Sequence, residues 1–120
     1  MSNQRFLQKY RIRRNADFQR VFRRRRSAAD EVIVVHVCEN DLPHARLGAA
    51  VSKKVGNAVR RNRWKRLLRE TFRITREDLP VGVDLVVVPR RGVQPSLSQL
   101  LTSLRSVARR AAARLSERGR

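Results

Sequence analysis

The sequence predicts an α+β sandwich in which helices pack on a small mixed sheet, and three observations support this fold class. Two β-branched segments, 31–38 and 83–89, are bounded by turn residues. Two longer segments, 57–73 and 96–117, repeat apolar residues every three or four positions, as amphipathic helices do. A chain of 120 residues with 41% hydrophobic residues is long enough for one domain with a core.

The expected elements follow the order α-β-β-α-β-α, and the whole chain is expected to form a single RNA-binding domain. Residues 1–13 show no clean period and are expected to form a flexible basic arm. A short helix is expected over 15–26, because Asn15 is suited to cap its start and Phe18 and Phe22 lie one turn apart.

Three strands are expected. The first covers 31–38, and the second covers 45–52 and is expected to run antiparallel to the first, because the connection between them is short. The third, 83–89, is apolar on both faces, which predicts a central strand. The second and third strands enclose the helix 57–73, so they form a β-α-β unit, for which the general rule is a right-handed crossover.

The last helix is expected to begin after a Ser96 cap and to end near Glu117, which leaves about 117–120 as a flexible tail. Its apolar residues recur every three or four positions, which indicates a face directed at the core. This stripe consists of Leu97, Leu101, Leu104, Ala108, Ala111 and Leu115.

The net charge of +19 is concentrated in two segments. Residues 1–26 hold ten Lys or Arg and one acid, Asp17, and residues 53–76 hold another ten and one acid, Glu70. Clustering of this kind has no value for solubility alone. It favours an anionic polymer as the binding partner.

On a helical wheel the 57–73 helix has one apolar and one basic side. The apolar side holds Trp64, Leu67, Leu68 and Thr71. The basic side holds Arg61, Asn62, Lys65, Arg66, Arg69 and Arg73. Like charges one turn apart repel each other, so this arrangement predicts a bound anion.

Membrane partners and disulfides are not expected. The apolar side of the basic helix is needed for the core, and no apolar run is long enough to span a bilayer, so a soluble cytoplasmic protein is expected. With a single cysteine, Cys38, the chain forms no intrachain disulfide, and the apolar strand around it suggests a buried, reduced thiol.

No catalytic or metal-binding residues are expected in the chain. The ten acids are scattered, and neither His36 nor His44 lies in a motif. Composition leaves open several RNA-binding classes, among them a ribosomal RNA-binding protein. A duplex-DNA-binding protein is disfavoured, because there is no helix-turn-helix spacing and no dimer zipper.

The segment "SKKVGNAVRRNRWKRLLRE", residues 52–70, resembles the protein subunit of bacterial ribonuclease P. Ser-Lys-Lys, Gly-Asn-Ala-Val, Arg-Asn-Arg, Lys-Arg and a further Arg all occur at the family's spacing. The segment "NADFQRVF" is similar to the family's N-terminal helix, and the resemblance covers about 10–110.

The resemblance implies a function that charge alone does not. In this family a large RNA contains the active site and hydrolyses the bond between the 5′ leader and the tRNA in precursor transcripts. The protein binds that RNA, and it assists substrate binding and the RNA's use of Mg²⁺ without a cofactor of its own. The implied RNA-binding residues are Lys53, Lys54, Asn57, Arg61, Asn62, Arg63, Lys65, Arg66, Arg69 and Arg73.

The resemblance also implies a cleft for the leader between the N-terminal helix and the sheet. Phe18, Phe22 and His36 occupy the positions that line it, and many members have Tyr in place of His36. The implied partners are therefore the catalytic RNA and precursor tRNA. The implied fold is ribosomal protein S5 domain 2-like, with a left-handed β-α-β crossover in place of the common right-handed one.

Overall fold

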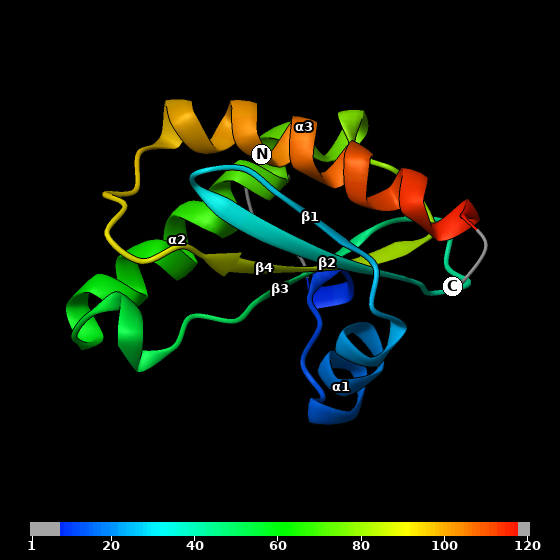
Figure 1. The fold of residues 1–120 in the computed structure, drawn as a ribbon, viewed down its shortest axis with the longest axis horizontal. Coiled ribbons are helices and arrows are strands. Elements are labelled where there is room, and N and C mark those ends of the chain that lie inside the picture. The colour runs from blue at the N-terminus through cyan, green and yellow to red at the C-terminus, as the bar shows by residue number, and fades with distance from the viewer. Residues whose placement is uncertain (1–7, 118–120) are drawn as a thin grey trace.

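The computed structural model describes residues 8–117 and confirms the α+β class, with three helices and a four-stranded mixed sheet (Figure 1). The helices and strands are α1 (Asn15–Arg24), β1 (Ser27–Ala29), β2 (Ile33–Glu39), β3 (Arg46–Ala49), α2 (Ala58–Thr75), β4 (Val83–Pro89) and α3 (Leu97–Ala113). Short 3-10 turns are η2 (Gln8–Tyr10), η3 (Lys53–Val55), η4 (Arg76–Asp78) and η5 (Arg114–Ser116).

The strand order in the sheet is β1-β2-β4-β3. β4 is central, as its apolar sequence predicts, and pairs antiparallel with β2 and parallel with β3. β3 therefore runs antiparallel to β2, as expected. The two strands are not neighbours, because β4, which follows α2 in the chain, inserts between them. β1 was not predicted, since Ser-Ala-Ala has little β propensity and pairs with β2 only at the sheet edge.

The first helix is shorter than the expected 15–26. It ends at Arg24, because Arg25 adopts a left-handed conformation with φ of 57° and its backbone N–H bonds the carbonyl of Phe22. This ending turns the chain directly into β1 and gives α1 its position beside the sheet.

The two faces of the sheet are covered unequally (Figure 1). α2 and α3 pack on one face and form the main core, in which Trp64, Leu68 and Phe72 of α2 are fully buried. α1 covers part of the other face with a smaller cluster that includes Val21 and Cys38. The predicted core position of Trp64 and the predicted burial of Cys38 are confirmed.

α3 begins after Ser96, whose Oγ accepts a hydrogen bond from the N–H of Gln99, as predicted. Its core stripe matches the predicted one in part, because Leu104, Ala108 and Ala111 are buried as predicted. The buried residues are Leu100, Ser103, Leu104, Val107, Ala108 and Ala111, whereas the predicted Leu97, Leu101 and Leu115 are half-buried. The apolar side of α3 is wide, so the predicted and the observed stripes both follow helical spacing. The way α3 packs against β1, β2 and α2 determines which residues are buried. The helix is followed by η5, which ends at Ser116.

Part of the predicted basic arm is packed on the domain. The backbone N–H of Ile12 donates to the carbonyl of Leu47 in β3 at 2.9 Å, and Arg11 forms a parallel bridge with the same residue. The rest of the predicted arm, residues 1–7, and most of the predicted tail, 118–120, lie outside the described residues. No helix within 8–117 is long and apolar enough to cross a membrane.

Candidate nucleic-acid interface

The start of α2 is fixed by a turn and a cap that the motif residues provide. The Oγ of Ser52 accepts from the N–H of Lys54, and the Oδ1 of Asn57 accepts from the N–H of Arg60 at 2.9 Å. Gly56 joins the two with φ of 151°, a conformation that a larger residue adopts only with strain, and an added Cβ would meet the Arg60 side chain. These contacts set the position at which the cationic helix begins.

The buried side of α2 determines which side chains face solvent. Because Trp64, Leu68 and Phe72 point into the core, the basic residues lie on the opposite side, as the helical wheel predicts. Six of the predicted RNA-binding residues are exposed: Lys53, Lys54, Asn57, Asn62, Arg63 and Arg66. Four are half-buried: Arg61, Lys65, Arg69 and Arg73. We call these ten residues the α2 cationic face.

Among residues 8–117, one carboxylate, that of Glu70, neutralises part of this face. Glu70 binds Arg73, with the Arg73 Nη2 at 2.5 Å from Oε2, and this hydrogen bond lowers the pKa of Glu70 below its ordinary value. Within residues 8–117 no other side chain of the cationic face has an ion-pair partner. Burial, together with the charges of Arg11 and Arg66, lowers the pKa of Arg69. Apart from Arg73, the cations of the face are therefore like charges without a carboxylate partner among residues 8–117, which favours binding of a polyanion.

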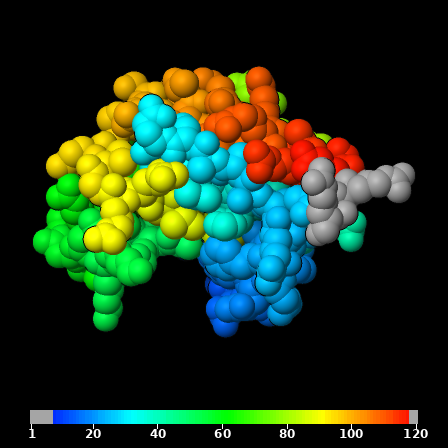
Figure 2. All heavy atoms as spheres, viewed as in Figure 1, coloured from blue at the N-terminus to red at the C-terminus, as the bar shows by residue number. Residues whose placement is uncertain are grey.

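Two of the predicted cleft residues lie together. The rings of Phe22 in α1 and His36 in β2 meet edge to face, with centroids 4.8 Å apart, and Phe22 is 37% exposed. Burial lowers the pKa of His36, so at neutral pH the imidazole is an uncharged aromatic ring. Val34 and Val88, a cross-strand pair, are half-buried. Figure 2 shows a hollow in the surface between α1 (blue) and the projecting start of α2 (green).

Phe18 is the third predicted cleft residue, and it occupies a different place. Its half-buried ring lies over Gly48 in β3, where an added Cβ would come within 2.8 Å of Cε1. It also lines a second hollow together with Lys65 and Arg69 of α2. α1 therefore spans the sheet, with Phe22 above β2 and Phe18 above β3.

Replacing Gly48 with alanine is expected to displace the Phe18 ring. Overpacking of this kind costs about 1–3 kcal/mol of unfolding free energy, measured by chemical denaturation. A Gly48→Ala/Phe18→Leu double variant is expected to be more stable than the sum of the two single changes, because the smaller side chain leaves room for the new methyl group. Strict additivity of the two changes would contradict the contact.

A buried charge that helix and strand periodicity do not predict holds α1 on the sheet. The Asp84 carboxylate in β4 is fully buried and accepts from Arg46 at 2.8 and 2.6 Å, from the Nη2 of Arg20 in α1 at 2.6 Å, and from Asn40 at 3.0 Å. Burial raises the pKa of Asp84, but the hydrogen bonds from Arg46 and Asn40 and the nearby cations outweigh it and lower the pKa overall. The only available signal was a lone acid inside an apolar strand.

The part of the chain that the structure describes contains no group of three His, Cys, Asp or Glu side chains that could hold a metal ion. The site consists mainly of cationic and aromatic side chains on α1, β2, η3 and α2. Such a combination suits contacts to phosphates and bases.

Comparison with known proteins identifies the family. The family model described as Ribonuclease P matches residues 6–112. The chain belongs to the ribonuclease P protein family. The ribonuclease P protein component of Staphylococcus haemolyticus is 46% identical over 82 residues, which cover 68% of this chain and 71% of the relative.

Solved structures of ribonuclease P proteins share the fold. The Staphylococcus aureus protein has a TM-score of 0.73 at 40% identity, over 83% of this chain and 93% of that one. The Thermotoga maritima protein has a TM-score of 0.77 at 33% identity, over 83% of this chain and 96% of that one. The family assignment from residues 52–70 is thereby confirmed, and with it a role in tRNA processing as part of ribonuclease P.

Proposed function

We propose that this ribonuclease P protein binds the catalytic RNA through the α2 cationic face. The supporting observation is that this face is held outward by the buried Trp64 side, while only Arg73 has a carboxylate partner among the described residues. RNA phosphates would supply the missing counter-charges. Lys and Arg contacts of this kind release counterions from the RNA and provide most of the affinity.

We further propose that the hollow beside α1 holds the 5′ leader of precursor tRNA. Phe22 and His36 supply an uncharged aromatic surface, on which a stacked base contributes about 1–3 kcal/mol. The half-buried valines of β2 and β4 extend it. The catalytic RNA hydrolyses the phosphodiester and uses Mg²⁺, while the protein positions the leader and has no catalytic residue or cofactor of its own. This activity would take place in the cytoplasm.

The test is multiple-turnover cleavage of a precursor tRNA by a bacterial ribonuclease P RNA at low millimolar magnesium, with and without this protein. We expect strong stimulation that is absent when the RNA is omitted. Absence of stimulation combined with tight binding to ribosomal RNA would instead support a ribosomal RNA-binding protein. Preference for duplex DNA over structured RNA at equal salt would support a DNA-binding protein.

Phe22→Ala is expected to reduce discrimination between precursor and mature tRNA by about tenfold, because it removes one stacking surface from the leader hollow. Affinities of the two tRNAs for the holoenzyme, measured at saturating protein, give this ratio. Affinity for the catalytic RNA alone is expected to stay unchanged. An equal loss for precursor and mature tRNA would contradict the leader assignment.

A further inference from the structure

Residues 8–14, which we call the N-terminal segment, are held in place on the domain. Tyr10 packs against Phe72 and lies under the Arg76 guanidinium, 4.4 Å from its ring centroid. Ile12 is 5% exposed and its N–H bonds β3. The segment therefore presents its remaining side chains from a fixed backbone.

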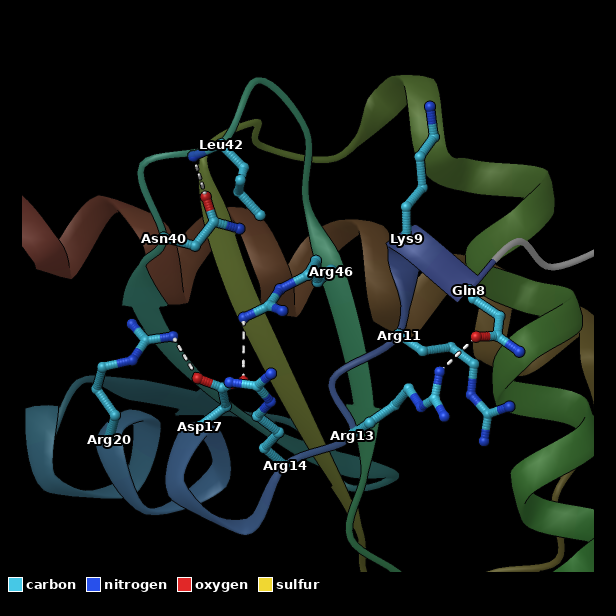
Figure 3. A pocket seen from close by; sticks show the side chains of 10 residues that line it. All are labelled: Gln8, Lys9, Arg11, Arg13, Arg14, Asp17, Arg20, Asn40, Leu42 and Arg46. Atoms are coloured by element: carbon cyan, nitrogen blue, oxygen red, sulfur yellow. Dashed lines mark hydrogen bonds and ion pairs between the residues drawn. The ribbon is translucent and has the colours of Figure 1, made fainter.

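Two of these side chains face α2 across a hollow of about 370 Å³. Arg11 and Arg13 form one wall and Lys65 and Arg69 form the other. In Figure 3, the Arg11 side chain extends from the N-terminal segment on the side where α2 lies. The floor is made by Ile12, Phe18, Leu47 and Ala49.

The cations of this hollow lack counter-charges. Of the described residues that line it, none is acidic. Among the described residues, the Arg13 side chain donates to the neutral amide of Gln8 and to no carboxylate (Figure 3). Asp17 lines a neighbouring hollow, which Arg11 and Arg13 also line (Figure 3), and there it lies 3.6 Å from Arg20 and 3.7 Å from Arg46.

The shape of the hollow favours a phosphate backbone over bases. Ile12 and Leu47 are buried, and the one aromatic ring in the floor, Phe18, is half-buried against Gly48, so the floor offers little aromatic surface for stacking. The walls are guanidinium and ammonium groups, which bind phosphate oxygens by charge-assisted hydrogen bonds.

We propose that this groove between the N-terminal segment and α2 binds a stretch of phosphodiester backbone of the catalytic RNA. The inference rests on the proposed function and adds a second wall to its RNA contact. We assign the bound phosphodiester backbone to the catalytic RNA because Lys65 and Arg69 belong to the α2 cationic face. The aromatic pair assigned to the leader, Phe22 and His36, does not line this groove.

The test compares an Arg11→Gln/Arg13→Gln variant with a control that loses the same charge, Arg109→Gln/Arg114→Gln. The control residues are exposed, have no side-chain partner among residues 8–117, and lie in α3 and η5. Affinity for ribonuclease P RNA is measured from 50 to 200 mM salt. We expect the groove variant to bind about tenfold more weakly and its log–log salt slope to fall by about 0.9 per lost phosphate contact.

The melting temperature of the groove variant shows whether weaker RNA binding comes from the lost arginine contacts or from misfolding. Removing like charges is expected to leave the melting temperature of the free groove variant at low salt equal to or above that of wild type, whereas misfolding would lower it. Equal affinity and slope in the groove and control variants would overturn the proposal. Loss confined to precursor tRNA binding would overturn it too, by assigning the groove to the leader. If wild type itself gives no stimulation of the RNA, the proposed function fails, which is a different result.

Discussion

Arg66→Glu is expected to weaken binding to the catalytic RNA about 100-fold. Arg66 is exposed at the middle of the α2 cationic face and has no ion-pair partner within residues 8–117. A hydrogen bond to a charged group contributes about 1.5–3 kcal/mol, and the new carboxylate adds repulsion of the phosphates. Filter binding or fluorescence titration at fixed salt gives the affinity.

Two comparisons make this result specific. Arg109→Glu on α3 changes the net charge equally and is expected to have only a small effect. Arg73→Glu is expected to lose less than Arg66→Glu, because Arg73 is already paired with Glu70. If all three variants bind equally weakly, the RNA responds to overall charge and not to this face.

The helices and central strand could be predicted because each has a strong local pattern. The valine-rich β4 is apolar on both faces, and α2 combines an Asn57 cap with an apolar stripe around Trp64. β1 lacked such a pattern, because Ser-Ala-Ala becomes a strand only through pairing with β2. The separation of β2 and β3 by β4 depends on how the α2 crossover packs, which no local segment determines.

The candidate site also has a part that local sequence patterns predict and a part that they do not. The cationic side of α2 followed from helical spacing, whereas the pairing of Phe22 with His36 was implied only by the family resemblance. The N-terminal segment is held on the domain by one backbone hydrogen bond from Ile12 and by the ring contacts of Tyr10. Neither contact requires a repeating pattern of residues, so the segment shows no periodicity. Long-range contacts of single residues leave no repeat in a sequence.

Asp84→Asn is expected to lower the free energy of unfolding by about 3 kcal/mol and the melting temperature by more than about 10 °C. The change removes the counter-charge of Arg46, whose side chain is 19% exposed, and of Arg20, which is more exposed. It also replaces one carboxylate oxygen with an NH₂ group, which would then face two N–H donors in place of accepting from them. Because Arg20 belongs to α1, the loss also loosens the helix that holds Phe22. At temperatures where the variant is folded, leader discrimination should fall more than affinity for the catalytic RNA.

Acid should abolish the difference between Asp84→Asn and wild type. The pKa of Asp84 is lowered in the folded protein, so its stabilising contribution is complete above the unfolded value of about 3.9 and is lost as pH falls through the folded pKa. Denaturation at pH 7 and at a series of pH values falling below about 3.9 checks this sign, because the difference should shrink steadily as the pH falls. Glu39→Gln is the matched control: its pair with Arg24 is exposed and contributes at most about 1 kcal/mol. Equal destabilisation by the two variants would contradict the view that burial makes the Asp84 pair strong, and with it the claim that this one carboxylate holds α1 above the sheet.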